Sequence, residues 1–108
     1  MTELTLNYKA TEESKELALY IENTSRLYQN KTKYIILNLA KKYAKGTFET
    51  EKALKSFYDL ATEGAKMYSK EFASVTEWNK IFTVEDRKAT ACQLLEGYFE
   101  NINGENPL

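Results

Sequence analysis

The sequence predicts an all-α fold, a small four-helix domain with a short extended N-terminal arm. Two observations predict it. Apolar residues recur at spacings of three and four through most of the chain, as they do on one face of a helix. Proline occurs once, at Pro107, and only four glycines interrupt the 108 residues. A chain with so few turn-forming residues favours long helices over the frequent tight turns of a β-sandwich or barrel.

The length and composition indicate a single helical domain over residues 1–108. Hydrophobic residues make up 43% of the chain and charged residues 29%, which are ordinary values for a globular protein. A chain of 108 residues is long enough for one core. Within this domain we expect residues 1–10 to form the arm and residues 104–108 to form a frayed tail.

The first predicted elements are the arm and a helix over residues 12–29. Residues 2–8 alternate polar and apolar side chains, but a lone strand is marginally stable, so we expect an extended arm lying on the helices. Thr11 supplies a hydroxyl cap, and acidic residues follow it in the first turn. The inner face of this helix then carries Leu17, Tyr20, Ile21, Thr24, Leu27 and Tyr28.

The second predicted helix covers residues 33–45. Asn30, Lys31 and Thr32 are expected to end the first helix and to supply a cap for the second. Gly46 stands just past the end of the helix, where a left-handed residue is expected. The inner face is predicted to carry Ile36, Leu39, Ala40 and Tyr43.

The third predicted helix begins near residues 47–50 and runs to Phe72. A long apolar stripe that includes Phe72 marks its inner face, and Gly64 within that stripe predicts close packing. A connector over residues 73–82 is expected to bury a few large side chains in the core. These are Val75, Trp78, Ile81 and Phe82.

The last predicted helix begins after Thr83 and ends at Asn103–Gly104. The Thr83 hydroxyl and the Asp86 carboxylate are both placed to accept hydrogen bonds from the first N–H groups of the helix. Its apolar face carries Ala89, Cys92, Leu95, Phe99 and Ile102. We therefore interpret Cys92, the single cysteine, as a small buried hydrophobic side chain and not a reactive thiol.

The residues that catalytic sites usually need are missing from the sequence. Histidine, the commonest general base and metal ligand, is absent, and one cysteine cannot supply a zinc or iron–sulfur site. No two glycines lie closer than seven residues, so there is no phosphate-binding glycine loop. We predict that the protein is not an enzyme and has no catalytic, cofactor-binding or metal-binding residues. The sequence also contains no secretory signal and no long apolar run, so we expect a cytoplasmic location.

Eight tyrosines are the unusual feature of the composition. Five of them occur at helical spacing with the core residues and are expected at the rim of the core, with the ring inside and the hydroxyl at water: Tyr20, Tyr28, Tyr43, Tyr58 and Tyr68. The periodicity explains Tyr8, Tyr34 and Tyr98 less well. Exposed tyrosine is favoured at interfaces, so these three are candidate contact residues.

The net charge of −1 conceals a basic segment in the middle of the chain. Residues 26–55 contain eight basic and two acidic side chains, whereas acidic side chains are in excess on both sides. This segment is a solvated face, a contact for an acidic protein partner, or a nucleic-acid site in which lysines meet phosphates and aromatic rings stack on bases. The sequence pI of about 5.6 argues against nucleic acid.

Several short motifs resemble a layout found in small helical proteins of tailed bacteriophages. The layout begins with L-Y-I-x-N and N-L-x-x-K-x-A-K-G-x-(Y/F), continues with A-x-x-Y-x-K-E-F and F-(S/T)-x-x-x-R, and spans about residues 19–99. The matching residues include Leu19–Asn23, Asn38–Leu39, Ala44–Gly46, Phe48–Glu49, Lys70–Phe72 and Arg87. Glu22 and Glu49 depart from it, because aspartate is commoner there. The resemblance implies a phage-encoded protein, and small phage proteins of this type often act by blocking a host or defence protein.

The leading hypothesis is therefore a non-catalytic phage-type accessory protein that binds, and inhibits, a host or defence protein with an acidic surface. Its predicted contact residues are Tyr34, Lys41, Lys42, Lys45 and Phe48. If the protein is phage-encoded, it would act in the host cytoplasm. The alternative is a small nucleic-acid-binding module that uses the same basic segment. Self-assembly through exposed tyrosines is a further alternative.

Overall fold

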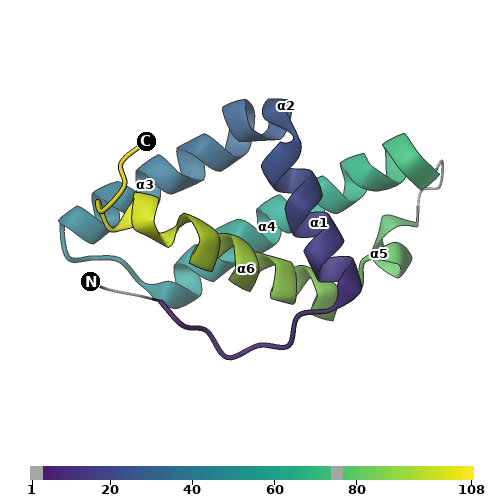
Figure 1. Ribbon diagram of the computed structural model, residues 1–108, viewed down its shortest axis with the longest axis horizontal. Helices are drawn as coiled ribbons and strands as arrows, with labels where there is room; N and C mark the ends of the chain where they lie inside the picture. Colours follow the sequence, from purple (N-terminus) through teal and green to yellow (C-terminus); the bar gives the residue numbers. More distant parts are fainter. Residues whose placement is uncertain (1–3, 74–76) are drawn as a thin grey trace.

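Helices joined by short connections make up nearly all of the computed structural model, which describes residues 4–73 and 77–108 (Figure 1). No strand occurs among these residues, so the all-α prediction is confirmed. Four helices are long, as predicted. In chain order the elements are α1 (Glu12–Asn23), α2 (Ser25–Leu27), the π-helical turn η1 (Tyr28–Thr32), α3 (Lys33–Ala44), α4 (Thr50–Tyr68), the π-helical turn η2 (Ser69–Ala73), α5 (Trp78–Ile81) and α6 (Val84–Ile102).

Helix α6 is the centre of the fold. It packs along α4, and it also contacts α1 and α3, as Figure 1 shows. The side chains between these helices are apolar and fully or almost fully buried. The largest of them are Phe57, Phe82, Leu17, Ile21, Ile36, Leu60, Leu94, Leu95 and Ile102.

Capping boxes begin α1 and α6. The Thr11 cap and the Thr83–Asp86 pair were predicted, whereas the bond from the Thr11 N–H back to Ser14 was not. The Thr11 hydroxyl accepts a hydrogen bond from the Ser14 N–H at 3.0 Å, and the Ser14 hydroxyl accepts one from the Thr11 N–H at 2.8 Å. Thr83 and Asp86 form the same pair at the start of α6. Each box satisfies two N–H groups that have no partner inside the helix.

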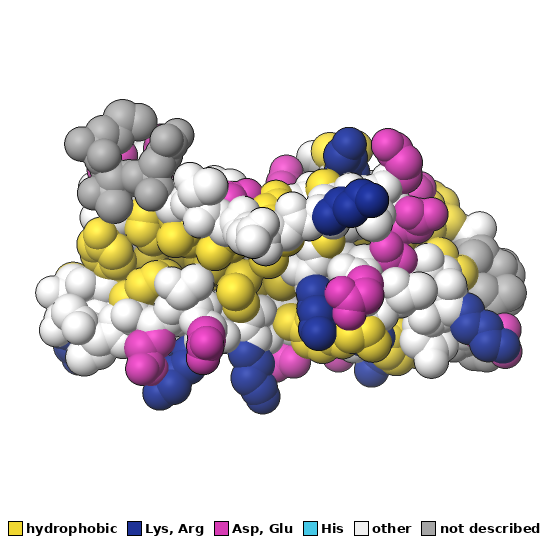
Figure 2. Space-filling view, turned by 90° about the horizontal axis from the view of Figure 1, so that it is seen from below, with side chains coloured by type: hydrophobic (Ala, Val, Ile, Leu, Met, Phe, Trp, Pro, Cys, Tyr) yellow, Lys and Arg dark blue, Asp and Glu magenta, His cyan; other side chains and the backbone are white. Residues whose placement is uncertain are grey.

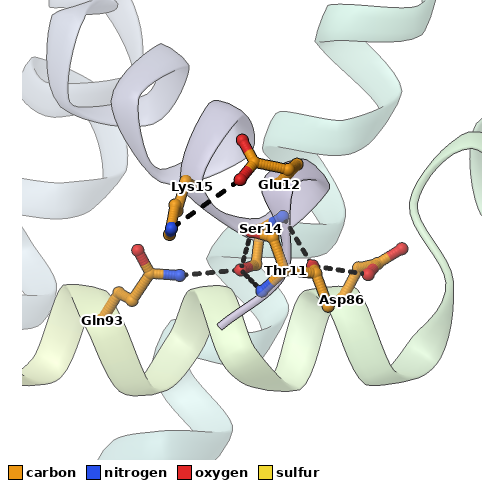
Figure 3. Close-up of polar contacts among 6 residues, drawn as sticks. All are labelled: Thr11, Glu12, Ser14, Lys15, Asp86 and Gln93. Atoms are coloured by element: carbon orange, nitrogen blue, oxygen red, sulfur yellow. Dashed lines mark hydrogen bonds and ion pairs between the residues drawn. The ribbon is translucent and has the colours of Figure 1, made fainter. Parts of the chain in front are cut away.

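The two capping boxes are also bonded to each other. The Thr11 hydroxyl donates to the Asp86 carboxylate at 2.8 Å, and the Gln93 amide donates to the Ser14 hydroxyl at 2.9 Å (Figure 3). These bonds hold the start of α1 against one side of α6. The residues that cap the two helices therefore also join segments that are far apart in the sequence.

The predicted break between the first two helices lies at the wrong residue. The chain leaves helical geometry at Thr24, which has φ −97° and ψ 98°, and not at residues 30–32. The Thr24 hydroxyl donates to the Tyr20 carbonyl, which ends α1 by competing with the helix ladder. Thr32 is fully buried in η1 and caps nothing, and η1 continues directly into α3.

Gly46 and Gly104 end α3 and α6 as predicted. Their φ angles are 75° and 88°, in the left-handed region that glycine adopts without steric cost. Beyond Gly46 the Thr47 N–H donates to the Lys42 carbonyl at 2.8 Å, which closes the last turn of α3.

Helix α4 and the connector after it follow the prediction in part. Gly64 is buried where α4 meets α1, so the expected close packing is confirmed. Phe82 is 1% exposed, as predicted, but Trp78 and Ile81 are half-buried and belong to the short helix α5. Val75 lies outside the described residues.

A buried arginine holds α5 against the rest of the fold. The Arg87 guanidinium lies 4.8 Å from the ring centroid of Trp78 and 5.2 Å from that of Tyr58. It also donates to the Thr62 hydroxyl at 3.0 Å and to the Phe82 carbonyl at 3.3 Å. These contacts compensate for burial of the charge.

The described part of the arm, residues 4–10, is extended and lies on the helices. Leu4 and Leu6 pack against the core. The Leu6 N–H and the Tyr8 hydroxyl both donate to the Glu96 carboxylate of α6 at 2.9 Å. One acidic side chain thus anchors the arm, and the expectation of an extended arm packed on helices is confirmed for these residues.

Candidate partner-binding surface

Three of the five predicted contact residues share the outer face of α3 and its end. Tyr34, Lys41 and Lys45 are separated by seven and four residues, a spacing that places side chains on one side of a helix. Tyr34 is 63% exposed, and both lysines are exposed. Leu37, which is 39% exposed, lies between them. From Tyr34 to Lys45 this α3 outer face extends about 16 Å.

Lys42 and Phe48 lie beside the Gly46 turn and apart from this face. Both line a shallow hollow of about 460 Å³ together with Leu39, Gly46, Thr47, Glu49 and Lys52. The Phe48 ring packs 5.7 Å from Tyr43 and 6.1 Å from Phe99 and is half-buried. Phe48 is therefore part of the core rim, so the predicted set divides into a helix face and a separate turn.

The two groups also differ in charge. Helix α3 contains no acidic residue, so the positive charge of Lys41 and Lys45 has no neighbouring carboxylate on their own helix. At the turn, the Glu49 carboxylate lies 2.8 Å from the Lys52 ammonium. The hydrogen bond from Lys52, and the charges of Lys52 and Lys42, lower the pKa of Glu49. Glu49 therefore stays ionised and offsets part of the positive charge around the hollow.

Of the three tyrosines that the periodicity left unexplained, only Tyr34 is exposed. The Tyr98 ring is half-buried and stacks on Phe57 at 6.3 Å, and the Tyr8 hydroxyl is bonded to Glu96. Burial is the first cause that raises the pKa of Tyr98 to about 12, and the charge of Glu22 adds to it. The five tyrosines expected at the core rim are all partly buried and packed on the core, as predicted.

A further hollow of about 720 Å³ lies between the arm, α4 and α6. Its walls include Tyr8, Leu54, Tyr58, Ala89 and Cys92. Viewed from the arm side, the molecule shows hydrophobic side chains at the surface, with acidic and basic side chains interspersed around them (Figure 2). Because both acidic and basic side chains line this hollow, its charge does not indicate whether a ligand would be anionic or cationic.

Cys92 is half-buried and lines this hollow, so the prediction that it is a fully buried side chain is wrong. The periodicity placed Cys92 correctly on α6, but the arm crosses above it and leaves a gap. Burial, and then the charge of Glu96, raise the pKa of the Cys92 thiol. A thiol with a raised pKa is a poor nucleophile at neutral pH, which agrees with the structural role expected for it.

Two exposed apolar side chains outside the α3 outer face were not predicted as contact residues from the sequence. Leu19 is 59% exposed on α1, and Phe72 in η2 is 62% exposed. The prediction placed Phe72 on the inner stripe of the third helix. That stripe requires the α-helical repeat to continue, but the π-helical turn rotates Phe72 out of register. Leu19 follows buried Ala18 and does not fit the three- and four-residue spacing of the inner face of α1. That departure from the spacing is the sequence feature that could have identified Leu19 as exposed.

Among residues 4–73 and 77–108, no group of three or more histidine, cysteine, aspartate or glutamate side chains is placed to hold a metal ion. Among the same residues, no helix has both the length and the apolar content that a membrane crossing requires.

Comparison with family models, with curated proteins and with solved structures gives no match to this chain.

Proposed function

We propose that this protein is a non-catalytic, phage-type accessory protein that binds an acidic surface of a host or defence protein and blocks it. The proposal rests on the α3 outer face. There an exposed tyrosine, a part-exposed leucine and two exposed lysines follow one side of a helix that contains no carboxylate. A rigid helix presents these side chains without a large ordering cost on binding.

The chemistry of this face suits a protein partner. A tyrosine ring provides a large contact area for little conformational entropy, and the lysines on the same face supply charge complementarity to carboxylates. The lack of histidine and the single cysteine support binding over catalysis. The resemblance to phage proteins supports a partner in the cytoplasm of an infected host.

The first experiment is affinity capture from infected host lysate with the full chain as bait. The test variant is Lys41→Glu/Lys45→Glu, which reverses both charges of the α3 outer face. We expect this variant to lose at least about 90% of the captured partner, a change of about 1.4 kcal/mol or more in binding free energy. The melting temperature should not change, because both side chains are exposed.

The matched control is Lys9→Glu/Lys70→Glu, which makes the same charge change at exposed positions on the arm and on η2. It should capture as much partner as the unaltered chain. Equal capture by the two double variants would reject the α3 outer face as the contact. Loss of the partner on nuclease treatment, or steep loss of binding between about 50 and 200 mM salt on bare DNA or RNA, would instead support the nucleic-acid alternative.

A further inference from the structure

Helix α1 crosses the later part of α4, away from the Gly46 turn (Figure 1). A hollow of about 590 Å³ lies there between residues of α1, α4 and η2. Two carboxylates and no basic side chain line it. The lining residues are Glu16, Leu19, Tyr20, Asn23, Thr24, Tyr68, Glu71 and Phe72.

The floor of this hollow is a cluster of packed aromatic rings. The Tyr68 centroid lies 5.3 Å from that of Tyr20 and 5.0 Å from that of Phe72. Tyr68 also packs edge-on against buried Phe82 at 5.1 Å, which ties the cluster to the core. The rings are therefore held in place before any partner arrives, although Phe72 is 62% exposed.

Hydrogen bonds fix the two carboxylates beside these rings. The Tyr20 hydroxyl donates to Glu71 at 2.8 Å, and the Tyr68 hydroxyl donates to Glu16. Burial, and then the bond to Glu71, raise the pKa of Tyr20, and the bond to Glu16 is the first cause that raises the pKa of Tyr68. Both hydroxyls therefore remain donors at neutral pH. Each carboxylate keeps lone pairs for a further donor.

No cation of the chain itself neutralises these charges in the part that the structure describes. The four ion pairs found there involve other carboxylates: Glu12, Glu49, Glu77 and Glu85. The charge of Arg26 acts on Tyr20, but Arg26 forms no ion pair with Glu16 or Glu71 in the same ranges. The hollow thus combines the exposed ring of Phe72 and two half-buried tyrosine rings with two oriented negative charges.

We propose that this hollow binds a segment of a partner protein that presents an arginine or lysine beside an aromatic or aliphatic side chain. A guanidinium or ammonium group is attracted both to the face of an aromatic ring and to a carboxylate, and arginine can bond a carboxylate through two N–H groups. The neighbouring apolar side chain would cover Leu19 and Phe72. The same two carboxylates repel phosphate, so nucleic acid does not fit this surface.

The test is selection of short random peptides displayed on a carrier and captured by the immobilised full chain. Peptides bound at the hollow should be enriched in arginine or lysine next to an aromatic or aliphatic residue. In a binding assay with the selected peptides, Glu16→Gln/Glu71→Gln should weaken affinity about tenfold at low salt. Glutamine keeps an acceptor for each tyrosine hydroxyl and removes only the charge. Phe72→Ser should weaken affinity about tenfold as well.

Glu63→Gln/Glu100→Gln is the charge-matched control, since both residues are exposed on α4 and α6 away from this hollow. It should bind as the unaltered chain does. Selection of acidic or purely apolar peptides, equal binding by test and control variants, or no enrichment at all would each overturn the proposal. Lys41→Glu/Lys45→Glu should leave peptide binding intact, so failure of the α3 contact and failure of this one are distinguished.

Discussion

At the scale of single residues, Gly64 decides how closely α1 approaches α4. A Cβ atom added there would lie 2.6 Å from Cγ1 and 2.7 Å from Cδ1 of Ile21. Ile21 is fully buried, so its side chain has no room to move away. The helix propensity of glycine is poor, yet a larger residue at this position would separate the two helices.

We therefore expect Gly64→Ala to lower the free energy of unfolding by about 1–3 kcal/mol, because overpacking outweighs the better helix propensity of alanine. Gly97→Ala is the matched control. Gly97 lies inside α6 with no atom within 4 Å of an added Cβ, so there the same change should raise stability by about 0.5–1 kcal/mol. Urea denaturation measures both. Stabilisation by both substitutions would contradict the packing seen at Gly64.

At the scale of elements, the helix ends show which features the sequence can predict. The Thr11 cap, the Thr83–Asp86 capping box and the turn at Gly46 depend on neighbouring residues, and all three were predicted. The π-helical turns were not, because they depend on packing between distant segments. Thr32 is fully buried within η1, and its hydroxyl has no hydrogen-bond partner among the described residues, a cost that only tertiary contacts can offset.

The same distinction applies to the candidate contact residues. Tyr34, Lys41 and Lys45 share a face because α3 is a regular helix. The prediction grouped them with Lys42 and Phe48 by their place in the basic segment, and did not use the helical spacing that separates them. Phe48 follows the Gly46 turn, and its direction depends on the rings of Tyr43 and Phe99. The spacing of residues around Phe48 therefore could not predict that its ring is half-buried.

Asp86 joins two elements, and its replacement tests that connection. Its carboxylate accepts hydrogen bonds from the Thr11 hydroxyl and from the Thr83 N–H. In Asp86→Asn an amide N–H₂ group would face one of these donors. We expect the free energy of unfolding at neutral pH to fall by about 1–3 kcal/mol. Glu100→Gln, an exposed carboxylate on the same helix, should change it by less than about 0.5 kcal/mol.

The pH dependence of stability gives a second measure of the same contact. Burial raises the pKa of Asp86, but the hydrogen bonds from Thr11 and Thr83 outweigh burial, so the pKa lies below its ordinary value of 3.8. A lowered folded-state pKa means that the ionised group stabilises the fold above the unfolded-state pKa. This contribution is lost as the pH falls through the folded-state pKa. The stability difference between the unaltered chain and Asp86→Asn should therefore shrink between about pH 7 and about pH 3, and a constant difference would contradict the assignment.

At the scale of the whole molecule, the two proposed contact surfaces share no residue and differ in charge. The α3 outer face carries two exposed lysines, whereas two carboxylates and no basic side chain line the aromatic hollow on α1 and the end of α4. The two proposals together predict that one copy of the protein contacts an acidic surface through α3 and a basic segment through the hollow.

The N-terminal arm is hydrogen-bonded to α6 through the carboxylate of Glu96. Because Leu6 and Tyr8 both donate to it, Glu96→Ala should release the arm from α6 and uncover the hollow that contains Cys92. The pKa of Tyr8, raised to about 12 by burial and then by Glu96, should fall toward its ordinary value of 10.0. The pKa of Cys92, which burial and Glu96 raise, should fall as well.

The rate of Cys92 alkylation by iodoacetamide measures this release, because only the thiolate reacts and it must be accessible. We expect a rate increase of about tenfold or more in Glu96→Ala, because release of the arm makes the thiol accessible and the lower pKa of Cys92 raises the thiolate fraction. Tyr8→Phe keeps the Glu96 charge and removes one of the two bonds, so it should react at an intermediate rate. Glu100→Ala is the control and should react as the unaltered chain does. An unchanged rate in Glu96→Ala would mean that the apolar contacts of Leu4 and Leu6 hold the arm without this carboxylate.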